Sequence, residues 1–145
     1  MTFLLDTNAI SEIGRERPDA GYMQWLLSVG DPRDTLDDRL HVSVLTIAEL
    51  ERGVLRLGPG KRKDDLRATL ELLVADYGPR ILPIDLSVAT TWATVAETNR
   101  RSGVVVGAVD ELIAATAITR DLVLVTRNVS HFERSGCQLH CPWSA

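Results

Sequence analysis

The feature that most constrains the fold is an alternation of short apolar runs with longer segments of helical periodicity. Three runs are typical of buried strands: residues 2–5 (TFLL), 40–44 (LHVSV) and 122–126 (LVLVT). Between them lie segments whose apolar residues recur every three or four positions, as in amphipathic helices. Parallel strands need such helical crossovers, so the alternation predicts an α/β fold with a mainly parallel sheet.

The remaining elements follow from the same pattern and its breaks. Helices are expected near residues 10–13 and 22–29 and over 45–57, 64–78, 85–103 and 109–121, with further strands at 80–84 and 137–143. Residues 30–39 and 127–136 are expected as loops, the latter with a short turn. With 145 residues and no internal repeat or linker, the chain is predicted to be a single domain over residues 1–145.

Composition excludes some classes of protein. The chain is 45% hydrophobic and 25% charged, as in soluble globular proteins. No apolar run approaches the roughly 20 residues of a membrane span, and no secretory leader is visible, so a cytoplasmic location is expected. The net charge of −4 gives no direct sign of nucleic-acid binding. Cys137 and Cys141 are expected to be free thiols.

Four polar residues stand in the same relation to the predicted sheet. Asp6 directly follows the first strand, and Glu49 lies on the helix after the second. Asp110 opens the apolar helix before the strand at 122–126, and Asn128 follows that strand. Right-handed connections would bring all four to one rim of the sheet, where ligands of α/β folds bind. Clustered carboxylates repel one another unless a cation is present, and Mg²⁺ or Mn²⁺ is the natural choice.

Each residue also has a purely structural explanation. Asp6 is a favoured residue for capping a following helix. Glu49 has Arg52 three positions on, which suits a surface ion pair. Asp110 in the first turn of a helix complements the helix dipole, and Asn128 is a common loop residue. No single position decides between these explanations and a functional site.

The local sequences around these positions carry a resemblance. The segments LLDTNAISE, VSVLTIAELERG, DELIAATA and LVTRNVSHFE occur in this order, with RILPID between the second and third and a terminal Pro-Trp. In these segments the chain resembles PIN-domain ribonucleases, and more narrowly the VapC/FitB-type toxins of bacterial type II toxin–antitoxin pairs. The resemblance implies a PIN-like three-layer α/β/α sandwich with acidic residues at the C-terminal rim of a mainly parallel sheet.

The resemblance also implies roles for individual residues. Asp6, Glu49 and Asp110 match the acidic metal-site positions, and Asn128 would orient water or substrate. Three further residues, Thr7, Asn8 and Thr46, would supply supporting hydrogen bonds, and Arg127 would contact phosphate. The implied reaction is Mg²⁺-dependent (or Mn²⁺-dependent) endonucleolytic hydrolysis of single-stranded or loop RNA.

One segment departs from the family pattern. Many relatives carry an acid in the region where this chain has Asn128 to Phe132, and His131 stands where an Asp often precedes the Phe. The departure supports an alternative: a catalytically weak or inactive PIN scaffold that binds RNA or protein. The sequence does not distinguish RNA from DNA as the nucleic acid that is cut.

The implied partners are a cognate antitoxin and the RNA substrate, with a homodimer or a toxin–antitoxin hetero-oligomer as the expected assembly and no membrane. Three aromatic residues, Tyr22, Trp25 and Trp92, offer loose support for dimerisation. Packing in the core is the favoured explanation for all three.

Overall fold

The computed structural model describes residues 1–31, 34 and 38–144. Within them, five strands form one all-parallel sheet in the order β3-β2-β1-β4-β5. The strands are β1 (Phe3–Leu5), β2 (Leu40–Ser43), β3 (Ile81–Leu82), β4 (Val123–Val125) and β5 (Leu139–His140). The predicted α/β class with a parallel sheet is confirmed.

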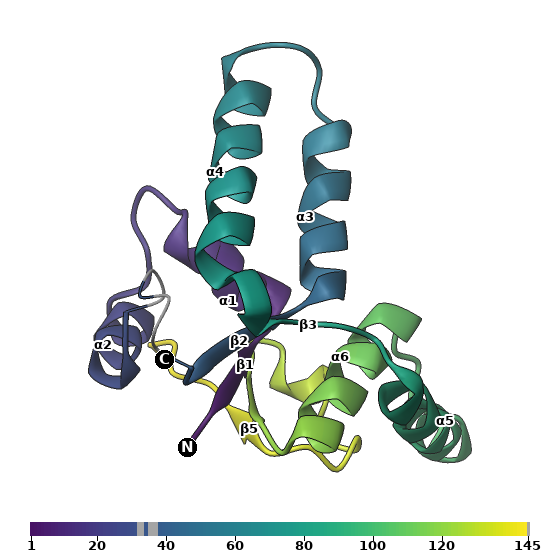
Figure 1. Cartoon of the computed structure of the whole chain (residues 1–145). Coiled ribbons are helices and arrows are strands. Elements are labelled where there is room, and N and C mark those ends of the chain that lie inside the picture. Colours follow the sequence, from purple (N-terminus) through teal and green to yellow (C-terminus); the bar gives the residue numbers. More distant parts are fainter. Residues whose placement is uncertain (32–33, 35–37, 145) are drawn as a thin grey trace.

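Helices cover both faces of this sheet, which gives three layers (Figure 1). The longer helices are α1 (Thr7–Ile13), α2 (Ala20–Val29), α3 (Val44–Leu55), α4 (Lys61–Tyr77), α5 (Leu86–Arg101) and α6 (Ala108–Arg120). Short 3-10 turns, η1 (Gly78–Arg80) and η2 (Val129–His131), complete the connections. Helices α3 and α4 stand side by side as a hairpin that rises away from the sheet.

The alternation of side chains along the strands separates two hydrophobic cores. Leu4 and Leu124 belong to the cluster that packs under α5 and α6. Phe3, Leu5 and Val125 belong to the other cluster, which packs against α1, α2 and the near ends of α3 and α4. Successive residues of a strand point to opposite faces, so strands of three residues suffice to join three layers.

The strand order places a switch point at the centre of the sheet. From β1 the chain builds β2 and β3 on one side, and it then returns to build β4 and β5 on the other. Beyond the carboxyl ends of β1 and β4 the connections therefore diverge, which leaves a crevice between them. Asp6 and Thr126, the residues that follow these two strands, lie at this crevice.

Three predicted boundaries were wrong for local reasons. The strand expected at 80–84 is only two residues long, because Pro83 follows it and has no N–H to donate to the sheet. The strand expected at 137–143 pairs only through Leu139 and His140 before Pro142. Helix α4 begins at Lys61 instead of Asp64, directly after Gly60, whose φ of +149° favours glycine.

Several further expectations concern the surroundings of the sheet. Both cysteines are free thiols, as predicted. Tyr22 is fully buried, and Trp25 and Trp92 pack against the two cores, so these aromatic residues serve packing. The loop expected at 30–39 falls partly outside the described residues. Across residues 1–31, 34 and 38–144, none of the helices combines the length and the apolar character needed to span a membrane.

Candidate active site

Asp6 lies at the centre of the crevice and is only 3% exposed. Its carboxylate accepts hydrogen bonds from the Thr7 backbone N–H at 2.7 Å and from the Thr126 hydroxyl at 2.9 Å. The Asn8 side-chain amide donates a third at 3.2 Å. The same carboxylate therefore caps α1 and joins the ends of β1 and β4.

The pKa of Asp6 is raised from its ordinary value of 3.8. Burial is the largest cause, because it disfavours the charged form. The hydrogen bonds from Thr126 and Thr7 oppose this effect, whereas the negative charges of Asp110 and Glu49 add to it. Repulsion between the carboxylates thus contributes as predicted, although burial outweighs it.

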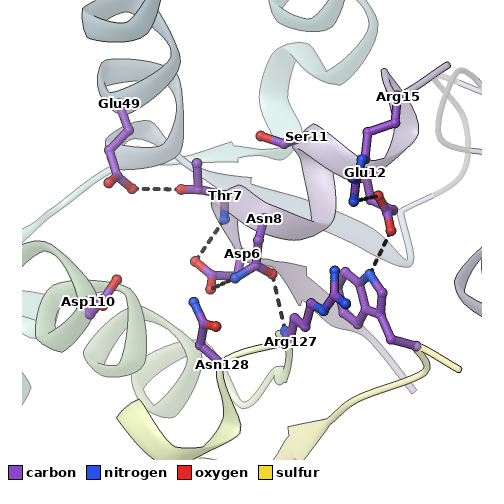
Figure 2. Close-up of a pocket in the computed structure, with 11 residues that line it drawn as sticks. Asp6, Thr7, Asn8, Ser11, Glu12, Arg15, Glu49, Asp110, Arg127 and Asn128 are labelled. Carbon is purple, nitrogen blue, oxygen red and sulfur yellow. Dashed lines mark hydrogen bonds and ion pairs between the residues drawn. The ribbon is translucent and has the colours of Figure 1, made fainter. Parts of the chain in front are cut away.

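Glu49 projects from α3 toward the start of α1 (Figure 2). The Thr7 hydroxyl donates to Glu49 Oε1 at 2.6 Å, and it also lies 3.2 Å from the hydroxyl of Thr46. Thr46 is fully buried in the first turn of α3, one turn before Glu49. The two threonines therefore tie the acidic residue of α3 to the helix that Asp6 caps.

Asp110 lies in the first turn of α6, with its carboxylate 3.4 Å from the His131 ring nitrogen Nδ1. The next residue, Glu111, accepts a hydrogen bond at 3.0 Å from the amide of Asn99, which is buried on α5. This contact joins the first turn of α6 to α5, and Asp110 lines the pocket beside it.

The segment after β4 supplies the remaining predicted residues. The Asn128 backbone N–H donates to the Thr126 hydroxyl at 3.0 Å, the same hydroxyl that contacts Asp6. The Arg127 backbone N–H donates to the side-chain oxygen of Asn8 at 3.2 Å. Asn8 thus links the loop after β4 to Asp6, because its amide nitrogen contacts that carboxylate.

These side chains line one pocket of about 590 Å³. Seven of the eight residues singled out in the sequence line it, and Thr46 supports it from behind through Thr7. Four lining residues were not predicted: Ser11, Glu12, Arg15 and Trp143. Ser11 and Glu12 continue along α1 at helical spacing from Asn8, and Arg15 keeps this spacing just past the end of the helix, a signal available in the sequence. Trp143 belongs to the terminal Pro-Trp of the resemblance, but nothing near it in the sequence marks it as a residue of the pocket.

The donor set fits a hard divalent cation in its chemistry. Asp6, Glu49 and Asp110 offer carboxylate oxygens, the ligands that Mg²⁺ prefers, and the negative charges of Glu49 and Asp110 help to raise the pKa of Asp6. Throughout residues 1–31, 34 and 38–144, however, no three His, Cys, Asp or Glu side chains are close enough to hold a metal ion as placed. The carboxylates share a pocket without forming a finished coordination shell.

The fold and site together define an α/β protein whose acidic residues gather at the switch point of a parallel sheet. The family model described as the PIN domain matches residues 3–135, and the chain belongs to this family.

Relatives span nearly the whole chain. Over 143 residues it is 34% identical to the plasmid stability protein StbB of Pseudomonas syringae pv. tomato, covering 98% of this chain and 99% of that one. Over 141 residues it is 36% identical to the toxin FitB of Neisseria gonorrhoeae, covering 97% of each. The crystal structure of FitAcB from Neisseria gonorrhoeae superposes with a TM-score of 0.86 at 34% identity, over 99% of this chain and 100% of that chain.

Proposed function

We propose that the protein is the toxin of a toxin–antitoxin pair and acts as a metal-dependent endoribonuclease on single-stranded or loop RNA. The observation that carries the proposal is the placement of Asp6, Glu49 and Asp110 around one pocket at the switch point. Similar proteins include the VapC ribonuclease Y4jK of Sinorhizobium fredii, which is 34% identical over 142 residues, and this likeness supports a ribonuclease activity.

In this proposal Asp6, Glu49 and Asp110 would hold Mg²⁺ or Mn²⁺. When bound, such an ion stabilises charge on phosphoryl oxygens and lowers the pKa of its water. Glu49 would hold or deprotonate the attacking water, and the Thr7 hydroxyl fixes that carboxylate at 2.6 Å. Thr46 holds Thr7 in turn, so both threonines act by positioning Glu49.

The residues after β4 would handle the substrate. Asn128 would orient water or the scissile phosphate from the end of the strand, and Arg127 would contact phosphate. Asn8 fixes both Asp6 and the backbone of Arg127, which keeps the acidic residues and the substrate contact in register.

The partners follow from the relatives. The solved neighbours include FitAB bound to the IR36 DNA fragment, at 32% identity, and VapBC-1 from nontypeable Haemophilus influenzae, at 28% identity. We infer that this chain, acting as one unit over residues 1–145 in the cytoplasm, is likewise held by a cognate antitoxin. A homodimer or a toxin–antitoxin hetero-oligomer is the proposed assembly.

A second candidate is a PIN scaffold that binds RNA or protein and cuts weakly or not at all. Asn128 and His131 stand where many relatives have an acid, and His131 lies 3.4 Å from Asp110. These observations favour weaker metal binding than a fourth acid would give.

The deciding experiment is cleavage of a labelled pool of structured and single-stranded RNAs by purified protein free of antitoxin. It is run with Mg²⁺, with Mn²⁺ and with EDTA. Asp6→Asn and Asp110→Asn are expected to lose cleavage, whereas Asp65→Asn, an exposed carboxylate on α4, is expected to keep it. Binding of RNA without metal-dependent cleavage would instead support the scaffold.

A further inference from the structure

The pocket has a second end that the acidic residues do not explain. Figure 2 shows Glu49 and Asp110 on one side of Asp6, and Arg127, Glu12 and Arg15 on the other. All of them line the same cavity of about 590 Å³. A cavity of this size holds more than one phosphate group, so it offers room for a neighbouring nucleotide.

Glu12 is a buried carboxylate at this second end, only 2% exposed. Its oxygen Oε1 accepts a hydrogen bond from the indole N–H of Trp143 at 2.9 Å and a longer one from the Asp19 backbone N–H at 3.4 Å. Trp143 is itself held by stacking on Tyr22, with ring centroids 4.6 Å apart. Glu12 is therefore fixed in place by the indole of Trp143 and the backbone of Asp19, without help from the acidic residues at the other end of the pocket.

The other oxygen of Glu12 contacts Arg15, whose terminal nitrogen lies 3.1 Å away. Arg15 remains 59% exposed although its partner is buried. An ordinary exposed ion pair on a helix contributes little, because both side chains move freely. Here one partner is immobile, so the guanidinium is held at the pocket wall with further N–H donors available for an anion.

We propose that Arg15, anchored by Glu12 and acting beside Arg127, binds the phosphate of the nucleotide next to the scissile bond. The proposal rests on the proposed ribonuclease function and adds a directional subsite to it. A guanidinium matches phosphate geometry with paired N–H donors. Phosphate contacts of this kind fix the position of a nucleic acid without reading its bases.

The position of the subsite follows from charge. The acidic end repels a phosphate unless a cation is bound there. The other end carries the two guanidinium groups of Arg15 and Arg127 against the single carboxylate of Glu12, so it keeps a net positive charge that attracts a phosphate. A single strand crossing the pocket would thus place one phosphate among the acidic residues and the adjacent one at the arginines.

The first test measures RNA binding without cleavage. Wild-type protein, Arg15→Gln and the control Arg17→Gln are titrated into labelled single-stranded RNA in EDTA. Arg17 is exposed and does not line the pocket. Arg15→Gln is expected to bind about 10–100-fold more weakly. The slope of log affinity against log salt should fall by about 0.7, the value for one lost phosphate contact on a single strand. Arg17→Gln should match the wild type in both.

The second test locates the contact. A cleavable oligonucleotide carries one neutral methylphosphonate linkage, moved along the positions that flank the scissile bond. In the wild type, one flanking position should lower kcat/KM about 10–100-fold. Arg15→Gln should lower kcat/KM for the unmodified oligonucleotide by the same factor. A neutral linkage at that flanking position should then cause no further loss in this variant, while Arg15→Lys should recover part of the activity.

The outcomes distinguish a failure of the proposed phosphate subsite from a failure of the proposed ribonuclease activity. Weaker binding by Arg15→Gln in EDTA, with no cleavage by any variant, supports the subsite and rejects the ribonuclease. Additive losses from the variant and the neutral linkage would overturn the subsite. So would unchanged RNA binding by Arg15→Gln with weaker binding of the antitoxin, since the arginine would then serve an acidic peptide. Unfolding curves of the variants exclude a folding defect.

Discussion

The contact between Trp143 and Glu12 leads to a prediction about stability. Trp143→Phe removes the indole N–H that donates to the buried carboxylate at 2.9 Å but keeps a ring to stack on Tyr22. A hydrogen bond to a charged group contributes about 1.5–3 kcal/mol, and the smaller ring adds a packing loss. We expect the free energy of unfolding to fall by about 3 kcal/mol. For a chain near 150 residues this lowers Tm by about 6–12 °C.

The pH dependence makes the prediction specific. Burial raises the pKa of Glu12, but hydrogen bonds from Trp143, Arg15 and the Asp19 amide outweigh it, so the pKa lies below the ordinary 4.5. A carboxylate with a lowered pKa contributes its full stability above 4.5 and loses it as the pH falls through the folded value. The Tm difference between wild type and Trp143→Phe should therefore be complete at pH 7 and shrink below pH 4.5.

The assay is thermal and urea unfolding from pH 7 to pH 3, with Trp25→Phe as the matched control. Trp25 packs edge-to-face on Phe3 with centroids 5.1 Å apart, so its replacement tests the loss of indole bulk. Its effect should be about 1 kcal/mol and should not depend on the charge of Glu12. In the cycle with Glu12→Gln, the two changes should be non-additive by about 1 kcal/mol. A Trp143→Phe loss equal to that of Trp25→Phe, or constant down to pH 3, would refute the reasoning.

Three further predictions concern the site and the C-terminal segment. Thr46→Ala should lower metal affinity or cleavage about 10–100-fold, with Thr46→Ser near wild type, because the hydroxyl positions Thr7; equal activity of both variants in RNA cleavage would contradict this. Mg²⁺ at 100 times its Kd should stabilise the wild type by about 2.7 kcal/mol and Asp6→Asn far less; equal Tm shifts in a metal titration would remove Asp6 from the metal site. Gly21→Ala should lower the free energy of unfolding by about 1–3 kcal/mol, because the new methyl group would lie 2.7 Å from the Ser144 hydroxyl and 2.9 Å from the Pro142 carbonyl. An unchanged urea unfolding curve would show that the C-terminal segment moves aside at no cost and would contradict this.

The sequence predicted the centre of the molecule well because local signals there coincide with the tertiary structure. Strands β1 and β4 are unbroken apolar runs, which is the sequence pattern expected of a parallel strand that is buried on both faces. Asp6 was marked by its place after such a run, where both capping and ligand binding use a carboxylate. Resemblance to a family then linked segments that periodicity alone leaves separate.

What the sequence could not predict depends on contacts between distant segments. Glu12 and Trp143 are 131 positions apart, and nothing near either residue announces the other. The lengths of the edge strands β3 and β5 were wrong for a different, local reason: an edge strand has one neighbour, and the proline that follows each strand ends it. The basic end of the pocket is visible only once the C-terminal segment packs against α1 and α2.

The observed role of Asp6 as a helix cap is compatible with its proposed role as a metal ligand, because one arrangement serves both. The carboxylate accepts the Thr7 N–H and so caps α1, and the positive end of the helix dipole partly offsets the cost of a buried negative charge. The same helix carries Asn8, which fixes the loop after β4, and one turn further on it carries Glu12, while Arg15 follows just beyond its last residue, Ile13. One helix of seven residues, with Gly14 and Arg15 directly after it, thus separates the acidic residues from the anchored arginine. An RNA strand bound across both ends of the pocket would be positioned by residues on and next to α1. Changes that tilt this helix should therefore impair phosphate positioning even where every acidic residue is retained.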